Sequence, residues 1–159
     1  MPKPDEPLPQ GPFPSPVIAA ALGLAQSTIG TWGSRGMFDH YDFGRGGRGR
    51  PMQMSLRDAL ATALLVHKTR SGIEAVELEN PSVFYRYADM WLRALHQAKR
   101  PRQMIISYFG IPGEGRVRIG INADALENPP EDQEPPTVEL VFDLDTIFGN
   151  LITKLRGNA

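Results

Sequence analysis

The sequence predicts an α+β fold, with helices in the N-terminal half and a small antiparallel three-stranded sheet followed by a helix at the C-terminal end. Two observations carry this prediction. Apolar residues recur every three or four positions up to about residue 99, and every second position from residue 104. The 159 residues, 41% of them hydrophobic, suffice for one domain or two small ones. We expect a disordered proline-rich arm (1–14), a helical unit (15–80), a connecting helix (81–100) and a small α+β unit (101–159).

Start and stop signals define the first two helices. Ser15 suits a helix cap and Pro16 the first helical position, while Gly23 suits the end of that helix. A second short helix is expected to run from Gln26 to Trp32, followed by glycines that mark its exit.

Ser55 and Asp58 form a variant of the capping box, which predicts a third helix through about Arg70. Its expected core face comprises Leu56, Leu60, Ala63, Leu64 and, as an option, His67. A short helical piece is expected at 73–78, and the long connecting helix at 82–99. In the connecting helix the apolar positions follow a 4-3-4-3 spacing: Phe84, Ala88, Trp91, Leu95 and Ala98.

The period changes to two beyond Pro101, which predicts a hairpin from strands at about 104–109 and 117–121. The acidic, proline-containing segment 123–136 is too polar to pack and is expected to be a mobile loop. A third strand (137–143) then leads into a helix with a complete apolar stripe: Leu144, Ile147, Phe148, Leu151, Ile152 and Leu155.

The net charge of −1 hides a strong polarity along the chain. Residues 14–72 carry seven basic side chains against three acids, and residues 81–118 carry seven against two. Residues 119–147 contain eight acids and no base. Such asymmetry indicates an anionic partner at the basic end of the chain.

Several functional classes are excluded or disfavoured. With no cysteine, there is no disulfide, thiolate metal site or cysteine nucleophile. The three histidines are scattered, so no metal site is expected. No nucleophile motif or phosphate-binding loop is present, and Asp143 and Asp145 suit helix caps better than catalysis. We therefore expect a protein that is not an enzyme and has no cofactor, no membrane span and no secretory leader.

The segment from Ala21 to Phe38 carries the strongest functional pattern. Two short helices around a glycine turn form the geometry that places a second helix in the major groove of DNA. The apolar positions Ile18, Leu22, Leu24, Ile29 and Trp32 would hold the two helices together. The outward positions are small and polar, which permits close approach to base edges and phosphates: Gln26, Ser27, Thr28 and Thr31. The alternative is an ordinary pair of packed helices.

Here the sequence resembles the MerR-type winged helix-turn-helix family, over about residues 16–80. In the first two helices, the resemblance rests on Gly23-Leu24 for the turn, Thr28-Ile29 and Trp32 for the recognition helix, and Gly36-Met37-Phe38 for the exit of that helix. It continues with Arg50 for the wing, Ser55 to Asp58 for the cap of the next helix, and Gly72 to Val76 for a further turn and helix. The sequence departs from the family at Ala25, where a capping Ser or Thr is usual, and at Met54, where an aromatic is usual. The long dimerisation coiled coil and the thiolate sensor are absent.

The seven residues from Gly44 to Arg50 are all glycine or arginine. Glycines let the backbone lie close to a surface, and arginines project toward anions. Arg48-Gly49-Arg50-Pro51 also matches the core of the AT-hook, an element that lies in narrow A·T minor grooves. A flexible solvated loop or an RNA-binding arginine-glycine segment are the alternatives. Its place in the wing favours contacts of Arg45, Arg48 and Arg50 with DNA.

Together these features predict a sequence-specific double-stranded DNA-binding transcription regulator that acts as a homodimer in the cytoplasm, associated with the nucleoid. Arg35 is expected to contact the DNA backbone. Phe84, Trp91 and Leu95 are expected to form the dimer interface against a partner helix, or alternatively to be buried against the C-terminal sheet of the same chain. The sequence leaves open whether RNA polymerase is a further partner. Two alternatives remain: a phage-type architectural protein (an excisionase or terminase small subunit), or a ligand-responsive module in which DNA binding is secondary.

Overall fold

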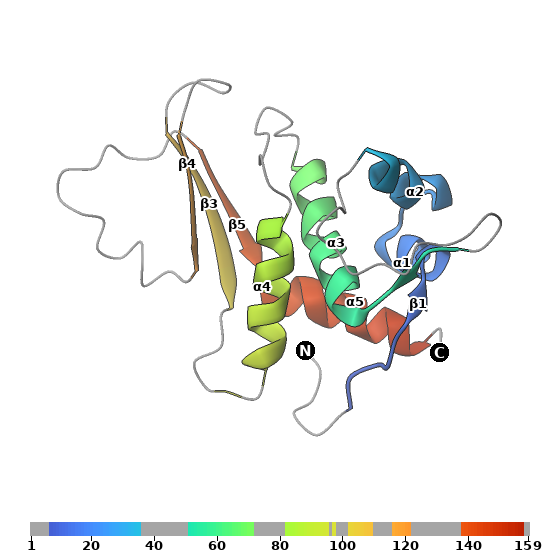
Figure 1. The fold of residues 1–159 in the computed structure, drawn as a ribbon. Coiled ribbons are helices and arrows are strands. Elements are labelled where there is room, and N and C mark those ends of the chain that lie inside the picture. Colours follow the sequence, from blue (N-terminus) through green and yellow to red (C-terminus); the bar gives the residue numbers. More distant parts are fainter. Residues whose placement is uncertain are drawn as a thin grey trace.

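The computed structural model of the chain describes residues 7–35, 51–71, 82–95, 97, 102–109, 116–121 and 138–157. Within these ranges the α+β class is confirmed (Figure 1). In chain order the elements are β1 (Phe13–Pro14), α1 (Ser15–Leu22), α2 (Gln26–Ser34), β2 (Gln53–Met54), α3 (Leu56–Arg70), α4 (Ser82–Arg93), β3 (Gln103–Phe109), β4 (Arg116–Ile121), β5 (Val138–Asp143) and α5 (Leu144–Gly157).

Helix α3 is the centre of the fold. It contacts α1, α4 and α5, and Figure 1 shows α4 alongside it and α5 passing across it. Every residue from Asp58 to Val66 is buried, so α3 is covered on all sides along this stretch and not only on the apolar face that its periodicity predicted. His67, which the sequence placed as an optional core residue, is exposed. The predicted capping box is present: the Asp58 N–H donates to Ser55 Oγ (3.1 Å), and the Ser55 N–H donates to Asp58 Oδ2 (2.7 Å).

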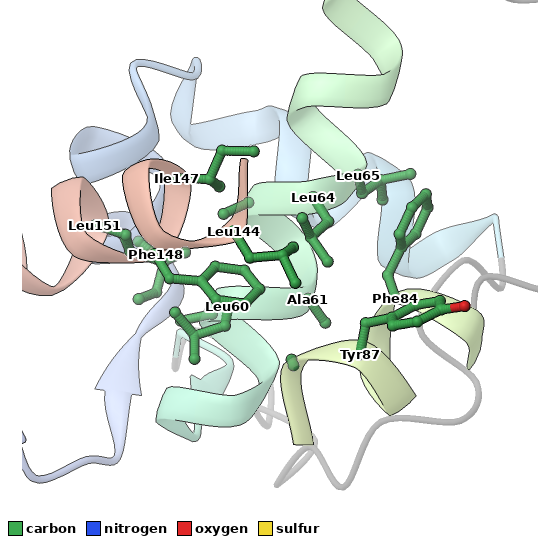
Figure 2. Packing of buried hydrophobic residues seen from close by; sticks show 14 of the residues in the cluster. Leu60, Ala61, Leu64, Leu65, Phe84, Tyr87, Leu144, Ile147, Phe148 and Leu151 are labelled. Atoms are coloured by element: carbon green, nitrogen blue, oxygen red, sulfur yellow. The ribbon is translucent and has the colours of Figure 1, made fainter. Parts of the chain in front are cut away.

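One hydrophobic core joins the N-terminal and C-terminal parts of the chain. Figure 2 shows Leu60 and Leu64 of α3 between the side chains of α5 on one side and those of α4 on the other. The whole predicted apolar stripe of α5 is buried in this core. Burying each large apolar side chain contributes about 1.5–3 kcal/mol. The boundary predicted near residue 100 therefore does not separate two cores.

The three-stranded antiparallel sheet of the C-terminal half has the strand order β4-β3-β5. Its three strands lie where the change of periodicity predicted them, and Met104 pairs with Ile121 on one side and with Phe142 on the other. Met104, Ile106 and Phe142 belong to the core that the helices share. On the opposite face Val141 is 56% exposed. Helix α5 follows β5 without an intervening residue, and the Leu144 N–H donates to the carbonyl of Arg102 (2.8 Å).

Helix α4 is shorter than the connecting helix predicted at 82–99, because it ends at Arg93. Phe84 and Trp91 are fully buried within the chain. The Trp91 ring packs edge-on against Phe148 of α5 (centroids 5.0 Å apart, planes at 76°), and its indole N–H donates to Asp145 (3.0 Å). The stripe of Phe84 and Trp91 is therefore covered by this chain's own helices, in line with the alternative of burial within the chain and not with a dimer interface. Leu95 is partly buried against the same core.

The arm at 1–14 is not disordered over its described part, residues 7–14. Phe13 is buried in the core and pairs with Met54, so β1 and β2 form a small antiparallel sheet. The prolines restrict the backbone to extended conformations, which lowers the entropy cost of docking it. Pairing also changes the start of α1: Pro14 occupies the N-cap position, and the Ser15 N–H donates to the carbonyl of Met52 (2.8 Å).

Other predictions lie outside the described residues. These are the helical piece at 73–78, the acidic loop at 123–136 and the glycine-arginine segment with its three arginines. In the part of the chain that the structure describes, no helix has the length and apolar character needed to cross a membrane. Nor does any group of three or more acidic or histidine side chains in that part form a metal site.

Candidate nucleic-acid interface

The first two helices form a pair around a tight turn. Ile18 of α1 and Ile29 of α2 are both fully buried, and Ile29 is the buried residue of α2. The remaining predicted contacts are partly buried against the same core: Leu22, Leu24 and Trp32. All five apolar positions that the sequence assigned to helix pairing therefore lie in or against the common core.

The turn between these helices depends on Gly23. Its φ of +66° lies in the left-handed region, which glycine adopts without the steric cost that a Cβ brings. The Gly23 N–H donates to the carbonyl of Ala20 (3.1 Å), and the Leu24 N–H donates to that of Ala19 (2.8 Å). This pair of hydrogen bonds ends α1 at the residue that the sequence predicted.

The predicted contact residues lie together on α2. Gln26, Ser27 and Thr31 are exposed, and Thr28 is half-buried. The Thr31 hydroxyl donates to the carbonyl of Ser27 (3.0 Å), which leaves its oxygen lone pairs facing outward as acceptors. Arg35 is exposed at the C-cap of α2, at the end of the same helix. Ser27, Thr31 and Arg35 are spaced four residues apart and so lie along one side of α2, with Gln26 and Thr28 flanking them in its first turn. We call these five residues the α2 face.

Gly30 lies on the exposed side of α2 between Ser27 and Thr31. Apart from its two neighbours and the backbone of its own helix, no described atom lies within 4 Å of a Cβ built on it, and it is not among the described glycines with positive φ. A mid-helix glycine costs about 1 kcal/mol relative to alanine. Within the part of the chain that the structure describes, neither packing nor backbone conformation accounts for this glycine. A surface that must approach α2 closely would account for it.

The α2 face carries no acidic charge. Residues 7–35 contain no Asp or Glu, and Arg35 is their basic residue. In α3, the acid Asp58 is buried and forms the capping box with Ser55. Arg57 of α3 contacts α4: its Nε lies 3.4 Å from Asp89 Oδ1, and its guanidinium carbon lies 3.7 Å from the centroid of the Tyr85 ring. The sequence counted Arg57 among the charges available to an anionic partner, and the structure assigns it to an internal contact.

Two basic side chains from distant helices bind the C-terminus of α1. Nη2 of Arg70, the last residue of α3, donates to the carbonyls of Leu22 (2.9 Å) and Gly23 (3.1 Å). Nζ of Lys154 in α5 donates to the carbonyl of Ala21 (2.9 Å). We call these two side chains the basic cap of α1. Sequence reasoning missed it, because a basic residue near a helix end signals a cap of its own helix and not of another one.

The glycine-arginine segment lies within a stretch of the chain that joins two described elements. The undescribed residues 36–50 begin after Arg35 of α2 and end before Pro51, which precedes β2. Strand β2 is held beside β1 at the start of α1. Met54, which replaces the aromatic of the resembled family, is fully buried. Arg45, Arg48 and Arg50 themselves lie outside the described residues.

No protein-family model and no curated protein sequence matches this chain.

Proposed function

We propose that the chain binds double-stranded DNA through the α2 face, as a winged helix-turn-helix protein of the MerR type. The observation that carries the proposal is the composition of α2: one buried apolar residue, Ile29, fastens a helix whose exposed side is small, polar and free of acids. A surface of this kind fits the floor of a major groove without steric or electrostatic conflict.

The proposed roles follow from position. Gln26, Ser27, Thr28 and Thr31 face base edges or phosphates, and Arg35 pairs with the DNA backbone. The glycine-arginine segment is proposed as the wing, with its three arginines in a flanking minor groove or on phosphates. The stretch 36–50 that contains it follows α2 in the chain and precedes β2, and this supports the placement, since β2 pairs with β1 just before α1.

We propose a homodimeric transcription regulator, because one winged module contacts too few base pairs for a specific site. With Phe84 and Trp91 buried within the chain, the interface has to use other surfaces. A regulator of this kind associates with the nucleoid. The architectural role and the ligand-responsive module are outcomes that the binding site decides. Palindromic half-sites support the regulator, and clustered direct repeats with strong bending support the architectural protein.

The test starts from the full-length protein and a pool of randomised duplexes, from which bound DNA is selected and sequenced. Affinity for the selected duplex and for a scrambled one is then measured by fluorescence anisotropy over a range of salt concentrations. Specific binding appears as a preference for the selected duplex that persists as salt is raised, since non-specific binding is almost entirely electrostatic. A protein that recovers no enriched sequence and binds no duplex contradicts the proposal.

A matched pair of variants locates the contact. Thr31→Glu puts an acid on the α2 face, and Thr153→Glu puts the same acid on an exposed position of α5. The two threonines make equivalent hydrogen bonds, to the carbonyl four residues earlier at 3.0 and 2.9 Å. We expect Thr31→Glu to abolish binding to both duplexes and Thr153→Glu to leave it largely intact. Equal effects would place the DNA elsewhere.

A further inference from the structure

The end of α1 is saturated with hydrogen bonds in a way that joins three helices. Five consecutive carbonyls, at residues 19–23, all accept. Backbone N–H groups of the turn take the first two, and the basic cap takes the last three. The last carbonyls of a helix have no partner within it and carry partial negative charge, so two cations there are electrostatically favourable.

The basic cap reaches α1 from two directions. Arg70 comes from the end of the central helix α3, and Lys154 comes from the C-terminal helix α5. Figure 1 shows α5 running from the sheet, past α3, to α1. The turn that aims α2 is therefore held by groups from both halves of the chain. By contrast, α2 itself has one buried side chain and no side-chain cap at its N-terminus.

We propose that Arg70 and Lys154 are positioning residues for DNA binding: they hold the C-terminus of α1 and so set the direction in which α2 leaves the turn. The inference rests on the proposed function of the α2 face. In this role neither cation contacts DNA, and the C-terminal helix is part of the support of the recognition helix. Loss of the cap lets the turn and α2 fluctuate, and binding has to reorder them.

The variants are Arg70→Met, Lys154→Met and the double replacement, which keep most of each aliphatic chain and remove the charge. Arg70→Lys is the conservative variant, because its ammonium can still donate to a carbonyl. Arg102→Met is the matched control, since it removes an exposed cation at the start of β3, away from α1. All measurements are made well below each variant's melting temperature, determined by circular dichroism.

Two readouts separate positioning from other roles. Hydrogen exchange followed by mass spectrometry reports the opening of α2 without DNA, and the salt dependence of binding counts phosphate contacts. We expect faster exchange in α2, about tenfold weaker binding to the selected duplex and an unchanged salt slope for each single variant. Arg70→Lys should recover most of the loss, and Arg102→Met should change neither readout.

Several outcomes overturn the proposal. If Arg70→Met lowers the salt slope by about one, Arg70 is a phosphate contact and not a positioning residue. If exchange in α2 and affinity both stay at wild-type values, the cap does not position α2. If the wild-type chain binds no DNA while the variants show faster exchange in α2, then the cap holds the turn and the proposed function is the part that fails.

Discussion

Helices α2 and α5 differ in how much of their surface the fold buries. Helix α5 buries seven of its 14 residues, whereas α2 buries Ile29 among nine. At its start α5 has a side-chain cap, because the Thr146 N–H donates to Asp143 Oδ1 (3.0 Å), and the N-cap of α2 is Ala25, with no such bond. The residues of α5 are half core residues, whereas most residues of α2 lie on its exposed or partly buried sides. A helix that the fold holds so lightly is a candidate for contact with something outside the chain.

The largest expected effect concerns the core side of this comparison. Phe148→Ala removes a fully buried ring that packs against Trp91, and should lower the free energy of unfolding by about 3–5 kcal/mol. Urea denaturation measures this change in the free energy of unfolding. The control is Val141→Ala, at a side chain that is 56% exposed, which should change stability by about 0.5 kcal/mol or less. Similar losses for the two variants would show that α5 is not seated in the core.

The two helix starts should respond with opposite signs. Asp143→Ala removes the cap of α5 and should cost about 1 kcal/mol, while Ala25→Ser adds a cap to α2 and should stabilise by a similar amount. Thermal and urea unfolding report both. A destabilising Ala25→Ser would mean that the backbone before α2 cannot accommodate a serine cap.

Gly30 sharpens the comparison, because stability and function should diverge there. Gly30→Ala places a methyl group in open space and should raise the free energy of unfolding by up to about 1 kcal/mol. If α2 lies against DNA, the same methyl group should weaken binding to the selected duplex. The measurement pairs urea denaturation with anisotropy. A variant that is more stable and binds equally well would show that nothing approaches Gly30 closely.

The smallest effect is a pH dependence at the end of α3. The His67 side chain is exposed, but part of its imidazole is removed from water; this desolvation, together with the positive charge of Arg70, lowers the pKa of His67 from its usual 6.5. The unfolded chain then takes up a proton more readily than the folded one, so this residue's contribution to stability is complete above pH 6.5 and declines as the pH falls below it. His67→Gln should therefore lose less stability than the wild type between pH 7.5 and pH 5 (about the range of histidine titration). Parallel profiles would contradict the shift.

Local features of the candidate site were predictable from sequence. Gly23 as the end of α1, the outward position of Gln26, Ser27 and Thr31, and the inward position of Ile29 all follow from turn chemistry and a helical period. Other parts of the site were not. The sequence gives no signal that Arg70 reaches Leu22, because the two residues are 48 positions apart. Nor does it show that Arg57 pairs with Asp89, 32 positions away.

The sequence by itself determined the α+β class, the capping box of α3, the end of α1 and the apolar stripe of α5. Each of these depends on groups within about four residues of one another, where spacing alone fixes geometry. Only the tertiary structure decided what covers each apolar face. A stripe such as that of Phe84 and Trp91 specifies an apolar surface but not its partner, which proved to be the chain's own helices and not a second copy. The basic cap belongs to the same class, because a cation can complete any helix end that the folded chain brings within its reach.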